Sequence, residues 1–302
     1  MFLKLFLMIL NFLFNNRYFF ILVGKVNKKF NKIHSIFVAY PASEEYAKKY
    51  CFHWYERHIK WKPYIVGFMK QNGFYTIFTA ISSVETDFSR HNKKQLEKLV
   101  KDVDTIKNLV GASQKSFAGI LPGVLFSMRI LRDTPEANIT VDAVIKAEEE
   151  VRFREYLDES VPLIILGGKG FIGRKLTDAL NSQNRKYYVV DSNERNSSEA
   201  NHLDWPHALR GERVILINLT RNCVIVNYLG LIWSEMIVLN ETYPGPSRGQ
   251  LNILKERKVR AYHIVGREAY SIPSFPLAYQ GGIPCCAALP SKQMEVMIKK
   301  LN

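Results

Sequence analysis

The sequence predicts an α/β fold in two domains, the second of which is built on a doubly wound parallel sheet. The chain has 302 residues, 47% of them hydrophobic, which is enough to bury two cores. After residue 160, short apolar runs alternate with helical or mixed segments, as parallel strands do with their crossovers. A glycine-rich turn joins the first of these runs to a helical segment, which supports the same class.

The first 23 residues are strongly apolar. They contain Lys4, Asn11, Asn15, Asn16 and Arg17, which make insertion as a membrane-spanning helix costly. No small-residue cleavage site precedes the basic run at residues 25–32. Three interpretations stay open: an interfacial or anchoring helix, an uncleaved signal anchor, and an upstream start codon in an AT-rich gene. We favour a soluble, cytoplasmic protein whose leader, residues 1–24, is atypical and is a candidate for association with a membrane surface.

The first domain is predicted to cover residues 25–158 and to mix strands with helices. Apolar runs of β type and amphipathic runs with a helical period follow one another along it. The turn signal Asn72-Gly73 separates two of the β runs, which predicts a hairpin. Strands are expected at 36–40, 64–69 and 74–82, and helices at 43–59, 93–110 and 140–157, with a glycine-bearing apolar segment at 116–126.

The second domain is predicted to cover residues 159–268, and residues 269–302 form a tail that packs back on the cleft between the domains. Short apolar runs recur in this domain between helical or mixed segments. This alternation predicts parallel strands with right-handed crossovers. The expected strands are 163–166, 187–190, 214–217, 236–239 and 261–265.

The stretch VPLIILGGKGFIGRKL, residues 161–176, matches the spacing G-x-G-x-x-G between a strand and a helix. In a dinucleotide site such glycines give a tight turn, close approach to the pyrophosphate and close packing of helix on strand. The helix would direct its first N–H groups at the phosphates. This context predicts a Rossmann domain, while a turn whose glycines only relieve crowding is the alternative. The expected cofactor-binding residues are Gly168, Lys169, Gly170, Phe171, Ile172 and Gly173.

The cofactor is expected to be NAD or NADP. Asp191 ends the strand after the glycine motif, where a carboxylate accepts hydrogen bonds from the adenosine ribose and repels a 2′-phosphate. This favours NAD, although Arg195 could pair with such a phosphate and weakens the preference. Thr220 and Gly266, which follow later strands, complete the expected cofactor contacts.

Polar or irregular segments follow three of the expected strands, at residues 218–221, 240–246 and 266–268. Ligands of an open parallel sheet bind at the carboxyl ends of its strands, so these segments are candidates for the substrate and nicotinamide side. The alternative is that they are capping and turn residues, which Asn, Thr and Pro often are. The residues expected to orient the substrate are Asn218, Thr220, Asn240 and Tyr243.

The segments INLTRN, VLNETYPGPSRGQL and YHIVG resemble the carboxyl half of the shikimate dehydrogenase-like superfamily. The resemblance covers residues 161–302 and implies NAD(P)-dependent oxidoreduction. The Asn-Thr-Asp-Gly element and the catalytic Lys/Asp pair of true shikimate dehydrogenases have no counterpart, so shikimate is not the expected substrate. In the first half, the order of FVAYPASEEYAKKY, LEKLVKDVDTIKNLVGA, FAGILPG and NITVDAVIKAEEEV is similar to that of the long-chain acyl-carrier-protein reductases.

Those reductases form a thioester on a cysteine, and the cysteines that could take this role are Cys285 and Cys286 in GGIPCCAALP. A helix starting after the preceding proline would lower the thiol pKa, and His263 is a candidate base. Two small side chains that fill space are the alternative. Cys223 could lie at the nicotinamide side, and Cys51 is expected in the core.

The distribution of charge and the spacing of cysteines and histidines argue against nucleic acid and metal ions as partners. The formal net charge is +14, but it is spread evenly along the chain, so no nucleic-acid arm is expected. No C-x-x-C pair exists and the histidine pairs are poorly placed for one ion, so no metal site is expected. A small-molecule or acyl-thioester substrate is the expected partner, and a homodimer is a further possibility.

The function expected from these patterns is NAD(P)-dependent oxidoreduction of a carbonyl-level or hydroxyl substrate held between the domains. Two alternatives stay open. One is the reduction of an acyl thioester through a cysteine nucleophile. The other is a non-catalytic, dinucleotide-sensing interaction protein, for which attachment to a membrane stays open.

Overall fold

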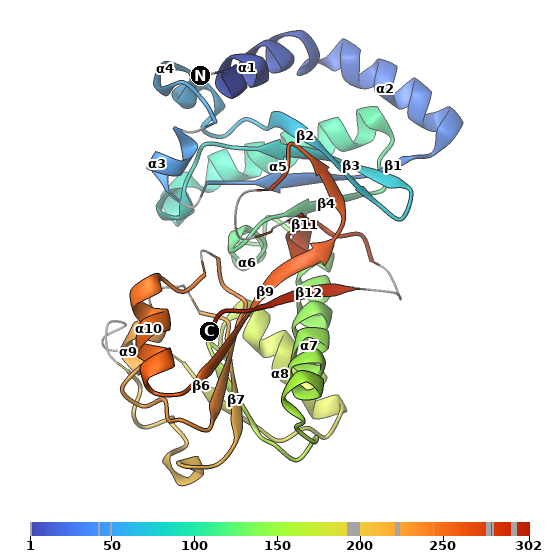
Figure 1. The fold of residues 1–302 in the computed structure, drawn as a ribbon. Helices are drawn as coiled ribbons and strands as arrows, with labels where there is room; N and C mark the ends of the chain where they lie inside the picture. Colours follow the sequence, from blue (N-terminus) through green and yellow to red (C-terminus); the bar gives the residue numbers. More distant parts are fainter. Residues whose placement is uncertain are drawn as a thin grey trace. The chain divides into compact units, whose positions relative to one another are not determined.

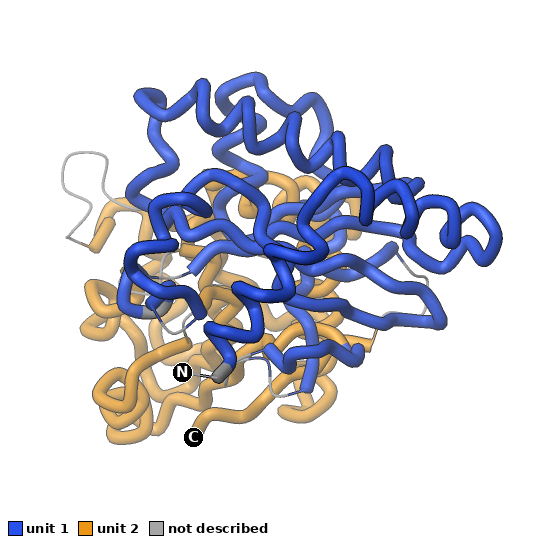
Figure 2. The backbone as a smooth tube through the Cα atoms, turned by 90° about the horizontal axis from the view of Figure 1, so that it is seen from above, with its two compact units in different colours: residues 1–139, 268–292 blue, residues 140–267, 293–302 orange. Residues whose placement is uncertain are grey.

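The computed structural model describes residues 2–41, 43–48, 50–191, 200–220, 224–243, 245–275, 279, 281–290 and 295–302. The chain forms two compact units, which Figure 2 colours separately. Unit 1 comprises Met1–Ile139 and Glu268–Lys292, and unit 2 comprises Thr140–Arg267 and Gln293–Asn302. Both contain a sheet with parallel strands and helices, so the predicted α/β class is confirmed.

The units differ in their bounds from the predicted domains. They divide inside the long helix α7 (Pro135–Glu155), near residue 140 rather than 159. Parts of the segment predicted as a tail on a cleft instead pair with strands of the two sheets: β10 (Tyr270–Ile272) pairs with β2 (Tyr64–Gln71) in unit 1, and β12 (Val296–Lys300) pairs with β9 (Arg260–Glu268) in unit 2. Strand edges have unpaired backbone groups, and the returning chain satisfies them.

The sheet of unit 1 has the order β10-β2-β3-β1-β4. Strand β1 runs parallel to β3 and β4, while β2 and β3 form the antiparallel hairpin that Asn72-Gly73 predicts. Both turn residues have positive φ, 50° and 79°, which Asn and Gly tolerate. The strand bounds are Ile33–Ala39 (β1), Tyr64–Gln71 (β2), Phe74–Ala80 (β3) and Gln114–Phe117 (β4).

Helix α5 (Lys93–Val110) packs on one face of this sheet, as its amphipathic pattern predicts. Its buried residues are Leu96, Leu99, Val100, Val103, Ile106 and Val110. The predicted helix at 43–59 is instead broken into α3 (Glu44–Ala47), α4 (His53–Glu56) and a 3-10 turn, because Tyr, Cys and Phe at the break are weak helix formers. Helix α6 (Leu121–Ser127) follows β4.

The apolar first residues form two helices, α1 (Phe2–Phe14) and α2 (Arg17–Phe30), which form the outer layer of unit 1 (Figure 1). The Asn11 amide accepts from Ile65 N–H at 2.7 Å and donates to Ile65 O at 2.7 Å, which fixes α1 on β2. No single described helix is long and apolar enough to cross a membrane; α1 and α2 reach that length only as a pair bent by 79°.

The sheet of unit 2 contains five parallel strands in the order β9-β8-β7-β5-β6, with β12 antiparallel on β9. The chain passes from β5 to β6 at one edge and returns to the other side of β5, so β5 and β7 flank the switch in strand order. The strands are Leu163–Leu166 (β5), Tyr187–Val190 (β6), Val214–Asn218 (β7), Met236–Asn240 (β8) and Arg260–Glu268 (β9), and the helices besides α7 are Phe171–Ser182 (α8), Ile225–Tyr228 (α9) and Arg248–Glu256 (α10).

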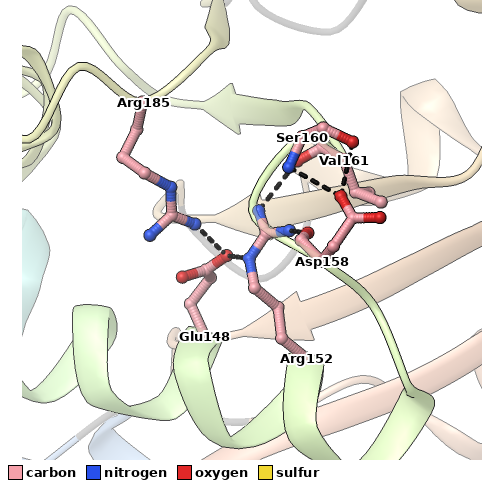
Figure 3. A network of polar contacts seen from close by, with 6 residues as sticks. All are labelled: Glu148, Arg152, Asp158, Ser160, Val161 and Arg185. Carbon is pink, nitrogen blue, oxygen red and sulfur yellow. Dashed lines mark hydrogen bonds and ion pairs between the residues drawn. The ribbon is translucent and has the colours of Figure 1, made fainter.

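A buried ionic network fixes the entry of the chain into β5 (Figure 3). Arg152 binds the Glu148 carboxylate and the backbone carbonyls of Asp158 and Val161, the last at 2.8 Å. Arg185 donates to the same Glu148 oxygen at 2.8 Å. Burial raises the Glu148 pKa, and the two guanidinium groups oppose this. The network holds the end of α7 against the loop that leads to the glycine turn.

Candidate functional site

The glycine turn lies at the carboxyl end of β5, beside the end of β7. Gly167 has φ +91°, which favours glycine, and a Cβ there would lie 2.9 Å from Thr220 Cγ2. A Cβ on Gly168 would lie 2.7 Å from Val189 Cγ1 of β6. The turn therefore fits between its two neighbouring strands only with glycine at both positions.

The remaining glycines bring the helix onto the turn. A Cβ on Gly173 would lie 2.2 Å from Gly167 O and 2.6 Å from Gly168 Cα, which are backbone atoms that cannot yield. A Cβ on Gly170 would lie 3.0 Å from Gly167 O, which is a close contact but a less severe one than at Gly173. Close packing of helix on turn, which the motif predicts for its third glycine, is thus present in α8.

The first turn of α8 presents backbone N–H groups at this edge of the sheet. An α-helix leaves its first N–H groups without intrahelical partners, and here the N-cap is Gly170, which has no side chain to accept them. Two exposed basic side chains lie nearby: Lys169 forms an ion pair with Asp204 at 3.3 Å, and Arg174 Nε donates to Lys169 O at 2.8 Å. Such an N-terminus suits a phosphate group.

Asp191 lies over the same turn. Its Oδ2 accepts from the Lys169 backbone N–H at 2.8 Å. The buried Tyr228 hydroxyl donates to Asp191 O at 3.0 Å and accepts from Asn201 N–H at 3.1 Å, which fixes the end of β6. The structure therefore brings together the glycine motif and the acidic residue. Arg195, Arg221 and Cys223 lie outside the described residues.

The ends of β7, β8 and β9 are joined by a buried side-chain network. Asn218 Nδ2 donates to Asn240 Oδ1 at 2.8 Å, and Asn240 Nδ2 contacts His263 Nδ1 at 3.0 Å. Thr220 donates to Asn218 Oδ1 through its hydroxyl at 2.6 Å, and Thr242 donates to Asn240 Oδ1 at 3.0 Å. Both asparagine amides are buried, and their donors and acceptors are used within the protein.

This network revises the predicted roles of Asn218 and Asn240. They fix strand ends, which is the capping alternative, and do not present polar atoms to a ligand.

The same network fixes the tautomer of His263. Because Asn240 donates to Nδ1, the neutral His263 ring carries its proton on Nε2. Desolvation lowers the pKa of His263, so the ring stays neutral at physiological pH.

Two further residues of the same edge are half-buried. Thr220 lies against Gly167 of the turn. Tyr243 follows β8 by three positions. Glu241, which sequence reasoning did not single out, donates its N–H to Asn218 O at 3.1 Å, and desolvation raises the pKa of its carboxyl to about 7.

Gly266 lies at an irregularity within β9, with φ 135° and with Met297 of β12 as its partner. Strands β8 and β7 separate β9 from β5, so Gly266 lies roughly 14 Å from the glycine turn at normal strand spacing. This irregularity, with its positive φ, explains why glycine occupies the position. Gly266 therefore does not contact the glycine turn, and its contact with the cofactor stays a prediction.

Cys285 and Cys286 lie in unit 1, in a three-residue 3-10 turn that contacts β4. This turn is too short to supply the helix dipole that the sequence suggested, and Cys285 is buried while Cys286 is half-buried. Cys286 is close enough to Tyr40 for its charge to raise the pKa of that phenol, to which burial and then Glu85 contribute more. His263 belongs to unit 2.

Tyr40 is the centre of a polar group at the carboxyl ends of β1, β3 and β4. Its hydroxyl donates to Glu85 Oε1 at 3.1 Å and accepts from Ile120 N–H at 3.0 Å.

Cys51 is buried, and desolvation raises the pKa of its thiol to about 11, so it is a core residue as predicted.

The described residues hold no group of three or more His, Cys, Asp or Glu side chains arranged for a metal ion. The two histidine pairs of the sequence, His53 with His58 and His202 with His207, are not part of such a group: His53 contacts Glu56 at 3.3 Å, and the rings of His202 and His207 stack. No protein-family model and no curated protein matches the chain.

Proposed function

We propose that unit 2 binds a dinucleotide, NAD or NADP, and that the protein is an oxidoreductase acting on a carbonyl-level or hydroxyl substrate. One observation carries the proposal: the Asp191 carboxylate lies on the glycine turn that opens α8, at the switch in strand order. The resemblance of residues 161–302 to the shikimate dehydrogenase-like superfamily supports it.

The residues present fit each part of a dinucleotide. The N–H groups that begin α8 would bind the pyrophosphate, and the glycines keep side chains away from it. Asp191 would accept from the adenosine ribose, which favours NAD over NADP. Thr220, across the switch point, would lie toward the nicotinamide.

The bound nicotinamide would supply or accept the hydride. A carbonyl that receives a hydride also needs a proton, and Glu241 is the candidate donor, because a carboxyl with a pKa of about 7 is protonated in about half of the molecules at neutral pH. Tyr243 is the second candidate for orienting the substrate. Asn218 and Asn240 would act as positioning residues through the strand ends.

Turnover tests this proposal. Purified protein is incubated with NADH or NADPH and a set of small aldehydes, ketones and acyl thioesters, and loss of nicotinamide absorbance is followed. We expect oxidation with at least one carbonyl compound and its loss in Gly170→Val. Tight dinucleotide binding without turnover of any substrate would instead support the non-catalytic sensor.

A second candidate function follows from the similarity of the first half to the acyl-carrier-protein reductases, and it uses Cys286, which is less buried than Cys285. Here the thiolate of Cys286 attacks the carbonyl of an acyl thioester, a new C–S bond forms, and the carrier leaves as its thiol. Hydride from NAD(P)H then releases an aldehyde and restores the cysteine thiolate. Labelling by a radioactive acyl thioester tests this: we expect loss in Cys286→Ala and retention in Cys51→Ala, and retention in both Cys285→Ala and Cys286→Ala would exclude it.

The proposed place of this activity is the cytoplasm. A chain of this length with four cysteines and no regular cysteine spacing is typical of a reducing compartment. We also propose that the apolar residues 1–23 bring the protein into peripheral contact with a membrane.

A further inference from the structure

The outer faces of α1 and α2 expose an unusual amount of apolar surface. Tyr18 and Phe12 are each 85% exposed. The exposed large hydrophobic residues of these helices are Leu3, Leu5, Phe6, Ile9, Phe12, Leu13 and Phe14 in α1 and Tyr18, Leu22, Val26 and Phe30 in α2. Many exposed large apolar residues on two successive helices of a folded surface indicate an interaction site.

The inner faces of the same helices pack on the rest of unit 1. The exposure of the outer faces is therefore not a sign that the helices are detached from the fold. Leu7 and Phe20 are buried. Asn27 donates to Val110 O at 3.0 Å and accepts from Ile33 N–H at 2.7 Å. A Cβ on Gly24 would lie 2.0 Å from Leu109 O, so glycine lets α2 touch the end of α5. The helices therefore present their outer faces from a rigid support.

The outer face of α2 is regular. Tyr18, Leu22, Val26 and Phe30 follow one another at four-residue spacing, which places them in one stripe along the helix. Beside this stripe lies an apolar groove of about 240 Å³. It is lined by Leu22, Val23, Val26, Asn27, Phe30, Lys32 and Ile33.

The charge around the stripe has one sign. Residues 1–43 contain no Asp or Glu. Their basic residues are Lys4, Arg17, Lys25, Lys28, Lys29 and Lys32. Apolar helical faces flanked by lysines bind anionic lipid surfaces, whereas two copies of this face would bring like charges together.

We propose that the outer face of α1 and α2 is a binding surface for an anionic lipid bilayer, on which unit 1 lies with both helices in the plane of the interface. The helices have 13 and 14 residues, whereas a spanning helix needs about 20. The groove beside Leu22 and Phe30 would accept part of an acyl chain. The inference does not depend on dinucleotide binding.

Vesicle flotation of the purified full chain tests this proposal. Vesicles of phosphatidylglycerol and phosphatidylcholine are compared with vesicles of phosphatidylcholine alone. We expect flotation with the anionic vesicles and on the order of a hundredfold weaker binding for the triple variant Lys25→Gln, Lys28→Gln and Lys29→Gln, at about fivefold for each lysine. The matched control is Lys94→Gln, Lys98→Gln and Lys101→Gln on the exposed side of α5, which should bind normally.

The apolar stripe is tested by Leu22→Ser, Val26→Ser and Phe30→Ser together. We expect at least a tenfold loss of binding with an unchanged circular dichroism spectrum, and no loss for Phe153→Ser with Tyr156→Ser, which are also exposed but lie in unit 2. Three results would overturn the proposal: no flotation of the wild type, equal flotation of the stripe variant, or equal binding to neutral vesicles. A lipid-free dimer that the stripe substitutions dissociate would assign the face to a second copy instead.

Discussion

The backbone N–H of Lys169 donates to Oδ2 of Asp191 at 2.8 Å, which ties the glycine turn after β5 to the end of β6. The two residues are 22 positions apart in the chain. This contact orders the turn and keeps a carboxylate at the edge where an adenosine ribose would bind. The proposed cofactor site therefore depends on local glycine spacing and on one residue from the next strand.

Replacing Asp191 by alanine should change the cofactor preference. The variant loses an acceptor for the ribose and a charge that repels a 2′-phosphate, so NADH should bind about tenfold more weakly and NADPH should lose much less. Fluorescence titration of both cofactors measures this. Asp191→Asn, which keeps an acceptor without the charge, is the control, and an equal loss for both cofactors in Asp191→Ala would contradict the proposed role.

Replacing Gly173 by alanine should destabilise unit 2. The new Cβ would overlap Gly167 O and Gly168 Cα, so α8 must move away from the turn, at a cost of about 2 kcal/mol or more. Gly230→Ala is the control, because a Cβ there meets nothing within 4 Å. Thermal unfolding measures both, and a similar melting temperature for the two variants would show that the turn is loosely packed.

Replacing Asn240 by leucine should cost about 2–4 kcal/mol of unfolding free energy, because it leaves buried partners in Asn218, Thr242 and His263 without hydrogen bonds. Urea unfolding measures the change. The control Asn252→Leu lies on the exposed side of α10 and should have little effect. A near-normal stability of Asn240→Leu would mean that water replaces the amide.

The two arginines near the end of α7 should differ sharply in their contributions. Arg152→Met leaves the buried Glu148 carboxylate with one fewer guanidinium and should cost about 3–5 kcal/mol. Arg154→Met removes the ion pair with Glu150, which has the same four-residue spacing but is exposed. It should lower the free energy of unfolding by less than about 1 kcal/mol. Equal unfolding midpoints in urea would contradict the importance assigned to burial.

Glu136 should make stability depend on pH. Burial raises the pKa of its carboxyl from 4.5 to about 7, so between these values the folded state binds more protons than the unfolded chain. Unfolding free energy should therefore fall as pH rises from 4.5 to about 7, by on the order of 2 kcal/mol. Glu136→Gln keeps an acceptor for Phe117 N–H and removes the titration. The slope in this range should be smaller in Glu136→Gln, and an unchanged slope would assign it to other groups.

Sequence reasoning located the features that depend on short-range pattern. Residues 163–166 and 187–190 are strands with the predicted bounds, because runs of apolar residues flanked by turn signals are local information. The glycine spacing likewise predicted the strand, turn and helix around Gly170. Gly167 was overlooked, although its positive φ decides the shape of the turn; its position directly after the strand was the available signal.

Contacts between distant segments could not be predicted in the same way. Asn240 and His263 meet because β8 and β9 are neighbours, and nothing in either segment alone specifies that register. The apolar first residues were interpreted as a leader, since hydrophobicity does not reveal that α2 packs on α5. The short turn at Cys285 was expected to be a helix, because a preceding proline is typical of both.

Fluorescence titration of the wild type with NADH, beside Gly170→Val and the control Gly230→Val, tests the central claim most directly. Gly170 has backbone angles that valine can adopt, and the new Cβ would meet only Gly167 O, at 3.0 Å, so the variant should fold while its side chain fills the space for the pyrophosphate. We expect saturable micromolar binding by the wild type and by Gly230→Val, and none by Gly170→Val. Failure of the wild type to bind either NADH or NADPH, or normal binding by Gly170→Val, would contradict a dinucleotide site at this turn.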